Sequence, residues 1–198
     1  MRSLFASIRH NLAGLARFSG RDTRRQFWPW AIFLFLLSTF VGLVFGAFVM
    51  ADIFVRMERY LIDHPEGLPP PVPGQPQQLP PELMPDLSGI ILPSMIMQVV
   101  VVLLLAAAVT RRLHDRDRTG FWGLMPLPFM AIGMANMDSA FALARGESAP
   151  TGLQALLLAA SPLYWIALIA LVVMLAGEGT KGPNRFGPEF DRSAGSGD

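Results

Sequence analysis

The chain has 198 residues, and its 16 Lys and Arg against 15 Asp and Glu give a net charge of +1. Only 16% of the residues are charged, where a soluble domain carries about 25%, and this excludes a disordered chain, a nucleic-acid-binding protein and an ordinary soluble enzyme domain. The chain has no Cys, so disulfides, zinc–thiolate sites and a thiol nucleophile are excluded as well.

The first 29 residues form a basic segment that we expect to contain an amphipathic helix. Between positions 3 and 18, apolar residues recur at steps of three and four, which is the spacing of one helical face. These residues are Leu4, Phe5, Ile8, Leu12, Leu15 and Phe18. A basic helix of this kind either lies in the membrane interface or packs on loops of the same protein, and the sequence favours neither.

Four apolar segments follow, at about 30–51, 90–109, 121–137 and 153–176. A helix needs about 20 apolar residues to cross a bilayer, so the first, second and fourth segments are long enough. The third is short, and Pro126 and Pro128 interrupt its start. The sequence therefore predicts an all-α, multi-pass integral membrane protein with a four-span domain over 30–176. A re-entrant third segment is the alternative.

The first long connection, at 52–89, has two parts. Asp52 and Arg56 are four residues apart, as in a helix that extends beyond the first span. From position 65 to 89 the chain is rich in Pro, which removes backbone donors, so we expect an extended loop on the outer face. Within the first span, Gly42 and Gly46 have the G-x-x-x-G spacing that allows close helix approach. Ordinary helix packing is the favoured explanation of this spacing, and a homo-oligomer contact is the alternative.

Basic residues are shared unequally among the segments outside the spans. Residues 1–29, 110–120 and 177–198 hold six, four and three of them, whereas 52–89 and 138–152 hold two and one. The positive-inside rule therefore predicts that both termini are cytoplasmic. A re-entrant third segment would instead place the tail, 177–198, outside.

Three polar motifs flank the spans. Residues 18–28 read F-S-G-R-D-T-R-R-Q-F-W, residues 111–122 read R-R-L-H-D-R-D-R-T-G-F-W, and residues 179–188 read G-T-K-G-P-N-R-F-G-P. Together and in this order they resemble the domain-of-unknown-function 805 family of bacterial inner-membrane proteins, over about residues 15–190. The resemblance implies a multi-pass inner-membrane protein and no catalytic residue. The Pro-rich stretch and the 138–152 loop are additions to the pattern of that family.

The cationic residues of these motifs are candidates for binding an anionic lipid headgroup or a phosphate. A helix through the first motif would place Arg21, Arg24 and Arg25 on one face. Asp115 could pair with Arg111, one turn away, or with Arg112. The candidate binding residues are Arg21, Arg24, Arg112, His114, Asn184 and Arg185. Residues with an expected structural role are Asp115, Gly120, Trp122, Gly182 and Gly187. For the Gly-rich tail the favoured interpretation is a tight turn that docks on the arginine loop, and the alternative is that its backbone N–H groups bind an anion.

The leading functional hypothesis is a non-enzymatic interaction or organising protein. Its cytoplasmic arginine cluster would engage anionic lipids of the bilayer, a membrane-protein partner or a second copy of the chain. The alternative is a membrane enzyme or facilitator that uses His114 and Asp115 on a phosphate-bearing lipid. The other histidines are His10 and His64, and no metalloprotease or serine-hydrolase motif occurs. We therefore expect no catalytic residue, no metal and no cofactor.

Overall fold

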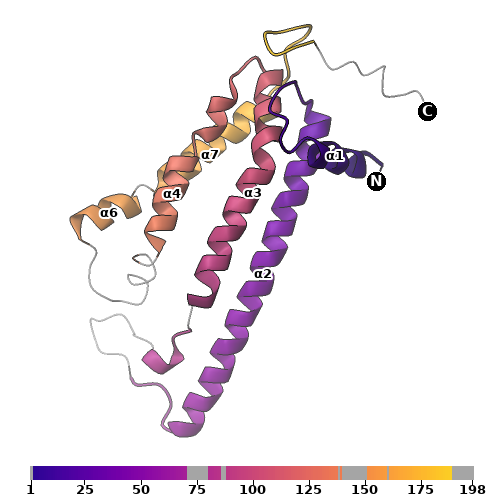
Figure 1. The fold of residues 1–198 in the computed structure, drawn as a ribbon. Coiled ribbons are helices and arrows are strands. Elements are labelled where there is room, and N and C mark those ends of the chain that lie inside the picture. Colours follow the sequence, from indigo (N-terminus) through magenta and orange to yellow (C-terminus); the bar gives the residue numbers. More distant parts are fainter. Residues whose placement is uncertain are drawn as a thin grey trace.

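The computed structural model describes residues 2–70, 80–85, 88–137, 139, 151–159 and 161–188. Within these residues the regular elements are all helical (Figure 1). The α-helices are α1 (Arg2–Ala13), α2 (Arg24–Asp63), α3 (Ser88–Asp115), α4 (Leu127–Ala135), α6 (Gly152–Ala159) and α7 (Ser161–Ala176). Two short 3-10 helices are η1 (Pro81–Leu83) and η2 (Gly120–Leu124). The prediction of an all-α fold is confirmed.

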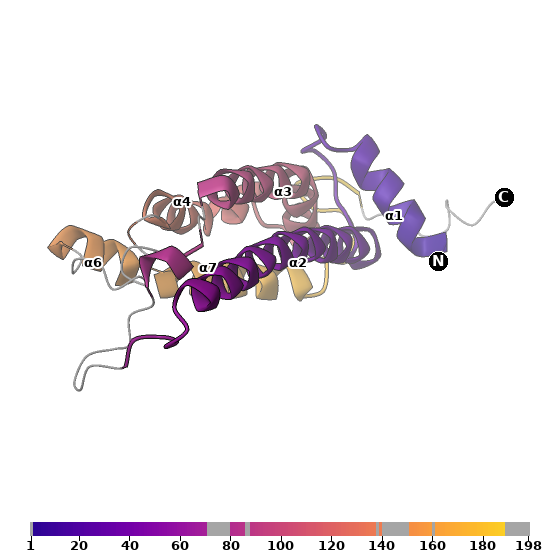
Figure 2. The same cartoon turned by 90° about the horizontal axis from the view of Figure 1, so that it is seen from below.

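The long helices form a bundle in which α3 contacts both α2 and α7, and α7 also contacts α4. Figure 2 shows the bundle from below, with α2 and α3 side by side. The beginning of α2, the end of α3 and the end of α7 lie at the same end of the bundle, where α1 crosses α2 (Figure 1). We call this the charged end, because buried charged residues gather there. The segments before α2 and after α7 therefore meet, although most of the chain separates them.

Three helical stretches are long and apolar enough to cross a membrane: Arg24–Asp63, Gly89–Asp115 and Ala155–Ala176. This confirms a multi-pass helical membrane protein. The third apolar segment is shorter, as its sequence indicated. Its described part consists of η2 and the nine-residue α4. Pro126 lies just before α4, and Pro128 in its first turn, where a missing backbone N–H leaves no helical bond unmade.

The connection after the first span is partly as predicted. Helix α2 continues to Asp63, and Arg56 forms the expected ion pair with Asp52 at 2.7 Å. Much of the Pro-rich stretch, at 71–79 and 86–87, lies outside the described residues. The expectation of a purely extended loop over 65–89 is wrong at η1, where Leu83 is buried, and at Ser88, where α3 begins.

The N-terminal helix is shorter than its apolar pattern suggests, since α1 ends at Ala13. It packs on the start of α2 through a polar face, where the Ser7 hydroxyl and the Asn11 amide both donate to the Gln26 carbonyl, at 2.6 and 2.9 Å. Phe5 and Leu12, on the predicted apolar face, are exposed. The polar side of α1 and Ile8 therefore pack on the protein, whereas Phe5 and Leu12 are open to the surroundings. A position of α1 in the membrane interface stays a prediction.

The first motif is not a continuous helix. Helix α2 begins only at Arg24, and Arg21 lies in the preceding turn, so the expected single face with Arg24 and Arg25 is wrong. Gly20 has a φ of 91°, a value that ends helical geometry and suits glycine. The backbone N–H of Asp22 then donates to the carbonyl of Arg111 at 3.1 Å. This bond holds the turn against α3 and points Arg21 toward the tail.

Candidate functional site

Five charged side chains are buried together at the charged end. They are Arg21, Asp22, Arg111, Arg112 and Asp115, with exposed fractions of 7%, 1%, 1%, 0% and 5%. We call them the arginine network. Buried ions of this kind persist only when they are paired and hydrogen-bonded, so the partners of each guanidinium decide what the network does.

Arg111 is bound by the N-terminal segment. Its Nε donates to the Asp22 carboxylate at 2.7 Å, and its Nη2 donates to the Asn11 side-chain oxygen at 2.8 Å. Its Nη1 donates to the carbonyls of Gly14 and Arg17 at 2.8 and 2.6 Å. The expected pair of Arg111 with Asp115 is therefore replaced by a pair with Asp22, 89 residues earlier.

Arg112 faces the opposite way and joins α3 to α7. Its Nη1 donates to the Asp115 carboxylate, its Nη2 donates to the Gly177 carbonyl, and its Nε donates to the Leu175 carbonyl at 2.9 Å. The last carbonyls of a helix have no partner within the helix, and a guanidinium can satisfy several of them at once. Arg112 therefore caps the end of α7, and Arg116 adds a further bond to the Met174 carbonyl.

Arg21 ties the first motif to the tail. Its Nε donates to Asp115 at 3.2 Å, and its two Nη atoms donate to the carbonyls of Gly182 and Thr180 at 2.7 and 2.6 Å. The Thr180 backbone N–H in turn donates to the Asp115 carbonyl at 2.8 Å. Asp115 thus joins Arg21, Arg112 and the tail, which gives it the structural role expected from the sequence.

The tail closes over α3 in a tight turn. Asn184 and Gly187 exchange backbone hydrogen bonds at 3.0 Å, and the Asn184 side chain donates to the His114 carbonyl at 2.9 Å. Gly182 and Gly187 have φ values of 75° and 134°, which favour glycine, in agreement with their expected structural role. Across this turn the His114 ring stacks on Phe186 with 3.9 Å between centroids.

The other sequence-predicted residues lie around this turn. Arg185 forms an ion pair with Asp117 at 3.1 Å, with both side chains half-exposed. A Cβ on Gly120 would lie 2.5 Å from the Thr110 methyl, so glycine is needed for η2 to approach α3 this closely. Trp122 is 43% exposed, and the Arg118 guanidinium lies 5.9 Å from its ring centroid. The structure thus brings together Arg21, Arg112, His114, Asn184 and Arg185 as a junction between the tail, the first motif and α3.

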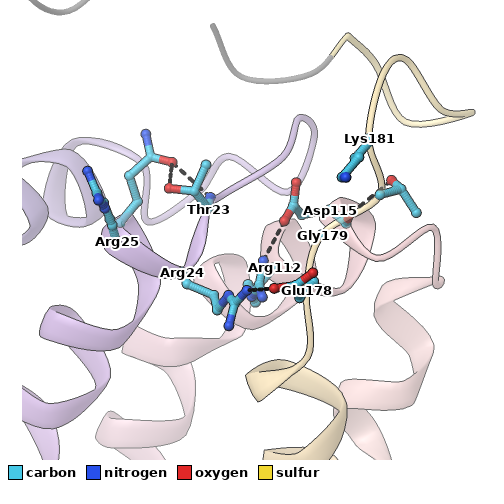
Figure 3. A pocket seen from close by; sticks show the side chains of 10 residues that line it. Thr23, Arg24, Arg25, Arg112, Asp115, Glu178, Gly179 and Lys181 are labelled. Carbon is cyan, nitrogen blue, oxygen red and sulfur yellow. Dashed lines mark hydrogen bonds and ion pairs between the residues drawn. The ribbon is translucent and has the colours of Figure 1, made fainter. Parts of the chain in front are cut away.

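A basic groove of about 750 Å³ opens beside the arginine network (Figure 3). Residues from the start of α2, the end of α3 and the tail line it: Thr23, Arg24, Arg25, Gln26, Arg112, Asp115, Glu178, Gly179, Thr180 and Lys181. Four of these are cationic and two are acidic, which leaves an excess of positive charge. The groove has both room and positive charge for an anionic group.

The cations at the rim of the groove differ from those of the network. Arg24 pairs with Glu178 at 3.0 Å, but their side chains are 47% and 83% exposed, so solvent weakens the pair. Arg25 and Lys181 are exposed and form no ion pair or hydrogen bond with the described residues. Sequence reasoning left both out of the candidate set, although Arg25 is adjacent to Arg24 and Lys181 lies inside the Gly-rich motif.

The contacts of His114 and Asp115 leave little access for a substrate, which their alternative role in catalysis would require. Both carboxylate oxygens of Asp115 accept hydrogen bonds from Arg21 and Arg112, and the His114 ring is covered by Phe186 on one face. Among the described residues, no group of three His, Asp or Glu side chains has the arrangement of a metal site. The geometry of these two residues is that of a junction between segments.

Comparison with known proteins gives one match. A family model described as protein of unknown function (DUF805) matches residues 15–188, which include all three motifs, the arginine network and the basic groove. No curated protein and no solved structure matches the chain.

Proposed function

We propose that this chain, which belongs to the family of proteins of unknown function DUF805, functions through its basic groove. The protein is a bacterial inner-membrane protein without a catalytic role, and its basic groove binds anionic lipid headgroups at the cytoplasmic face. It acts as an organising or interaction protein for those lipids or for a membrane partner. The observation that carries this proposal is the set of exposed cations, Arg24, Arg25 and Lys181, around a groove of about 750 Å³.

The position of the groove supports a lipid as the source of the anion. Trp28 lies one helical turn after Arg24 and Arg25 and is partly exposed, and tryptophan favours the level of the headgroups. The apolar part of α2 continues from there into the bundle. Each Lys or Arg close to an anionic surface contributes about 1 kcal/mol of binding, so several around one groove can hold a headgroup.

The arginine network supports the groove without taking part in binding. Its guanidiniums are engaged by protein atoms, and no buried side-chain nitrogen or oxygen among the described residues lacks a hydrogen bond. A network satisfied in this way holds the three segments of the groove in fixed positions. The segments that carry the rim cations are therefore held in place before a ligand binds, which reduces the conformational entropy lost on binding.

Charge-neutralising variants test the groove. We expect Arg25→Gln combined with Lys181→Gln to lower the affinity for phosphatidylglycerol about 30-fold, because two contributions of about 1 kcal/mol are lost. The measurement is native mass spectrometry of lipid retained from mixed phosphatidylglycerol and phosphatidylcholine micelles. Phosphatidylcholine retention should not change.

The matched control is Arg9→Gln combined with Arg17→Gln. These two arginines are also exposed and precede the same end of α2, so the change in net charge is equal. Equal loss of phosphatidylglycerol in the groove variant and the control would attribute binding to net charge alone. Unchanged retention in the groove variant would reject the groove as the binding site.

The proposed orientation has its own test. The unequal distribution of basic residues between the two sides supports a cytoplasmic charged end. We expect a reporter fused after Gly74 to be active outside the cell membrane, and one fused at Asp198 to be active in the cytoplasm. An external Asp198 fusion would mean that the third apolar segment does not cross the membrane, and would overturn this orientation.

A further inference from the structure

A second cavity, open on one side, lies between the helices in the apolar part of the bundle, away from the basic groove. It has a volume of about 410 Å³, and residues of α2, α3, α4 and α7 line it. Most of the lining is aliphatic, and no charged residue is part of it. Four polar side chains reach it: Ser38, Ser94, Gln98 and Tyr164. A volume in this range is typical of sites for small organic ligands.

Three of these side chains lie within the apolar part of the bundle, whereas Ser94 is exposed and lies one turn of α3 farther from the charged end than Gln98. From their positions along α2, α3 and α7, Ser38, Gln98 and Tyr164 are roughly 18–26 Å from the charged end, at about 1.5 Å of rise per residue. With the charged end at headgroup level, that depth falls within a hydrocarbon core of about 30 Å. Water is scarce there, so a polar group without a partner raises the free energy of the protein.

The four side chains differ in whether they have a partner. The Ser38 hydroxyl donates to the Phe35 carbonyl of its own helix at 2.9 Å. The Ser94 hydroxyl, the Gln98 amide and the Tyr164 hydroxyl form no hydrogen bond within the part of the chain that the structure describes. An amide carries two N–H donors and each hydroxyl carries one. The cavity therefore presents several hydrogen-bond donors within the depth of the bilayer. A ligand with acceptor atoms would satisfy them.

We propose that this cavity binds an isoprenoid quinone, an uncharged lipid whose ring presents carbonyl acceptors to Gln98 and Tyr164. The uncharged lining excludes a phosphate headgroup, because an ion is costly at this depth without an opposite charge. The ester carbonyls of diacyl lipids lie at the two edges of the hydrocarbon core, whereas Tyr164, about 18 Å from the charged end, lies near its middle. A quinone places its carbonyl groups on an otherwise apolar molecule, which matches a lining of aliphatic side chains with few donors.

An adjoining apolar cavity extends the site toward the charged end. Its volume is about 200 Å³, and it shares Val102, Leu105 and Tyr164 with the larger cavity. It continues past Val109 and Gly123, near the start of the third apolar segment. A short length of isoprenoid chain can occupy this extension while the ring lies beside Gln98. The inference concerns binding and is independent of the basic groove.

Equilibrium binding of decylubiquinone to the purified full chain in detergent micelles tests the proposal. We expect saturable binding of one molecule per chain, about tenfold weaker after Gln98→Leu, because one or two hydrogen bonds to the ring are lost. Tyr164→Phe should weaken binding by a smaller factor. Ser38→Ala is the matched control: it removes a hydroxyl from the same cavity, but one that already has a partner, so binding should not change.

Three results would overturn the proposal. They are partition of decylubiquinone without saturation, equal affinity of the wild type and both Gln98→Leu and Tyr164→Phe, or displacement of decylubiquinone by 1-decanol at equal concentration. The last result would show that the alkyl tail of the ligand alone determines binding. Thermal unfolding of each variant confirms that it is folded, and Tyr164→Phe decides the question alone if Gln98→Leu does not fold. Loss of headgroup binding in the groove variants should leave decylubiquinone affinity unchanged.

Discussion

Asp115→Asn is expected to lower the free energy of unfolding by about 3–5 kcal/mol, the range for breaking a buried ion pair from one side. The Asp115 carboxylate is shared by Arg21 and Arg112, which are 7% and 0% exposed. Without it, two buried guanidiniums lose their common counter-charge, and their remaining partners are carbonyls and the Thr180 hydroxyl, all uncharged. The loss should be measurable as a shift of SDS-induced unfolding in mixed micelles, followed by circular dichroism.

Asp117→Asn is the matched control for this prediction. Asp117 lies two residues away and pairs with Arg185 at 3.1 Å, but the two side chains are 47% and 58% exposed. Exposed ion pairs contribute about 0–1 kcal/mol, so this variant should unfold nearly as the wild type does. Equal effects of Asp115→Asn and Asp117→Asn would show that the arginine network contributes nothing to stability beyond a surface pair.

The second large effect is expected at the other side of the network. Asp22→Asn should also cost about 3–5 kcal/mol of unfolding free energy, because Asp22 and Arg111 are each 1% exposed and pair at 2.7 Å. His10 also contacts Asp22, at 2.9 Å. The same SDS titration measures the loss, and faster proteolysis near α1 should accompany it, since Arg111 holds the segment between α1 and α2.

A double-mutant cycle separates this pair from its surroundings. We expect Asp22→Asn and Arg111→Met together to cost less than the sum of the single changes, with a coupling of about 0.5–3 kcal/mol. Recovery should be incomplete, because Asn11 and two carbonyls also lose the donors of Arg111. Additive losses would mean that Arg111 and Asp22 do not stabilise each other.

The arginine network also explains why three short motifs far apart in the chain belong together. Arg21 belongs to the first motif, Arg112 and Asp115 to the second, and Thr180 and Gly182 to the third. Hydrogen bonds among these residues connect the segment before α2, the end of α3 and the segment after α7. A membrane bundle gains little from burying apolar side chains between its helices, because lipid is equally apolar. A polar junction at one end therefore contributes specific stability that the apolar helices do not supply.

The sequence determined the fold class, because the length and apolar character of a segment decide by themselves whether a helix can cross a membrane. It also indicated the weak third segment, through Pro126 and Pro128, and the family, through the order of the three motifs. Local spacing identified the Asp52–Arg56 pair correctly, since both residues lie on one helix and four positions apart.

Only the tertiary structure decided which arginines are buried and which line the basic groove. Spacing along α3 allowed Arg111 to pair with Asp115, but a carboxylate 89 residues earlier is the actual partner. Arg21 similarly reaches carbonyls about 160 residues later. Partners of this kind depend on how the ends of separate helices meet, and no local periodicity encodes that. The fold gives buried partners to other arginines and not to Arg25 and Lys181. These two residues are therefore exposed cations at the rim of the basic groove.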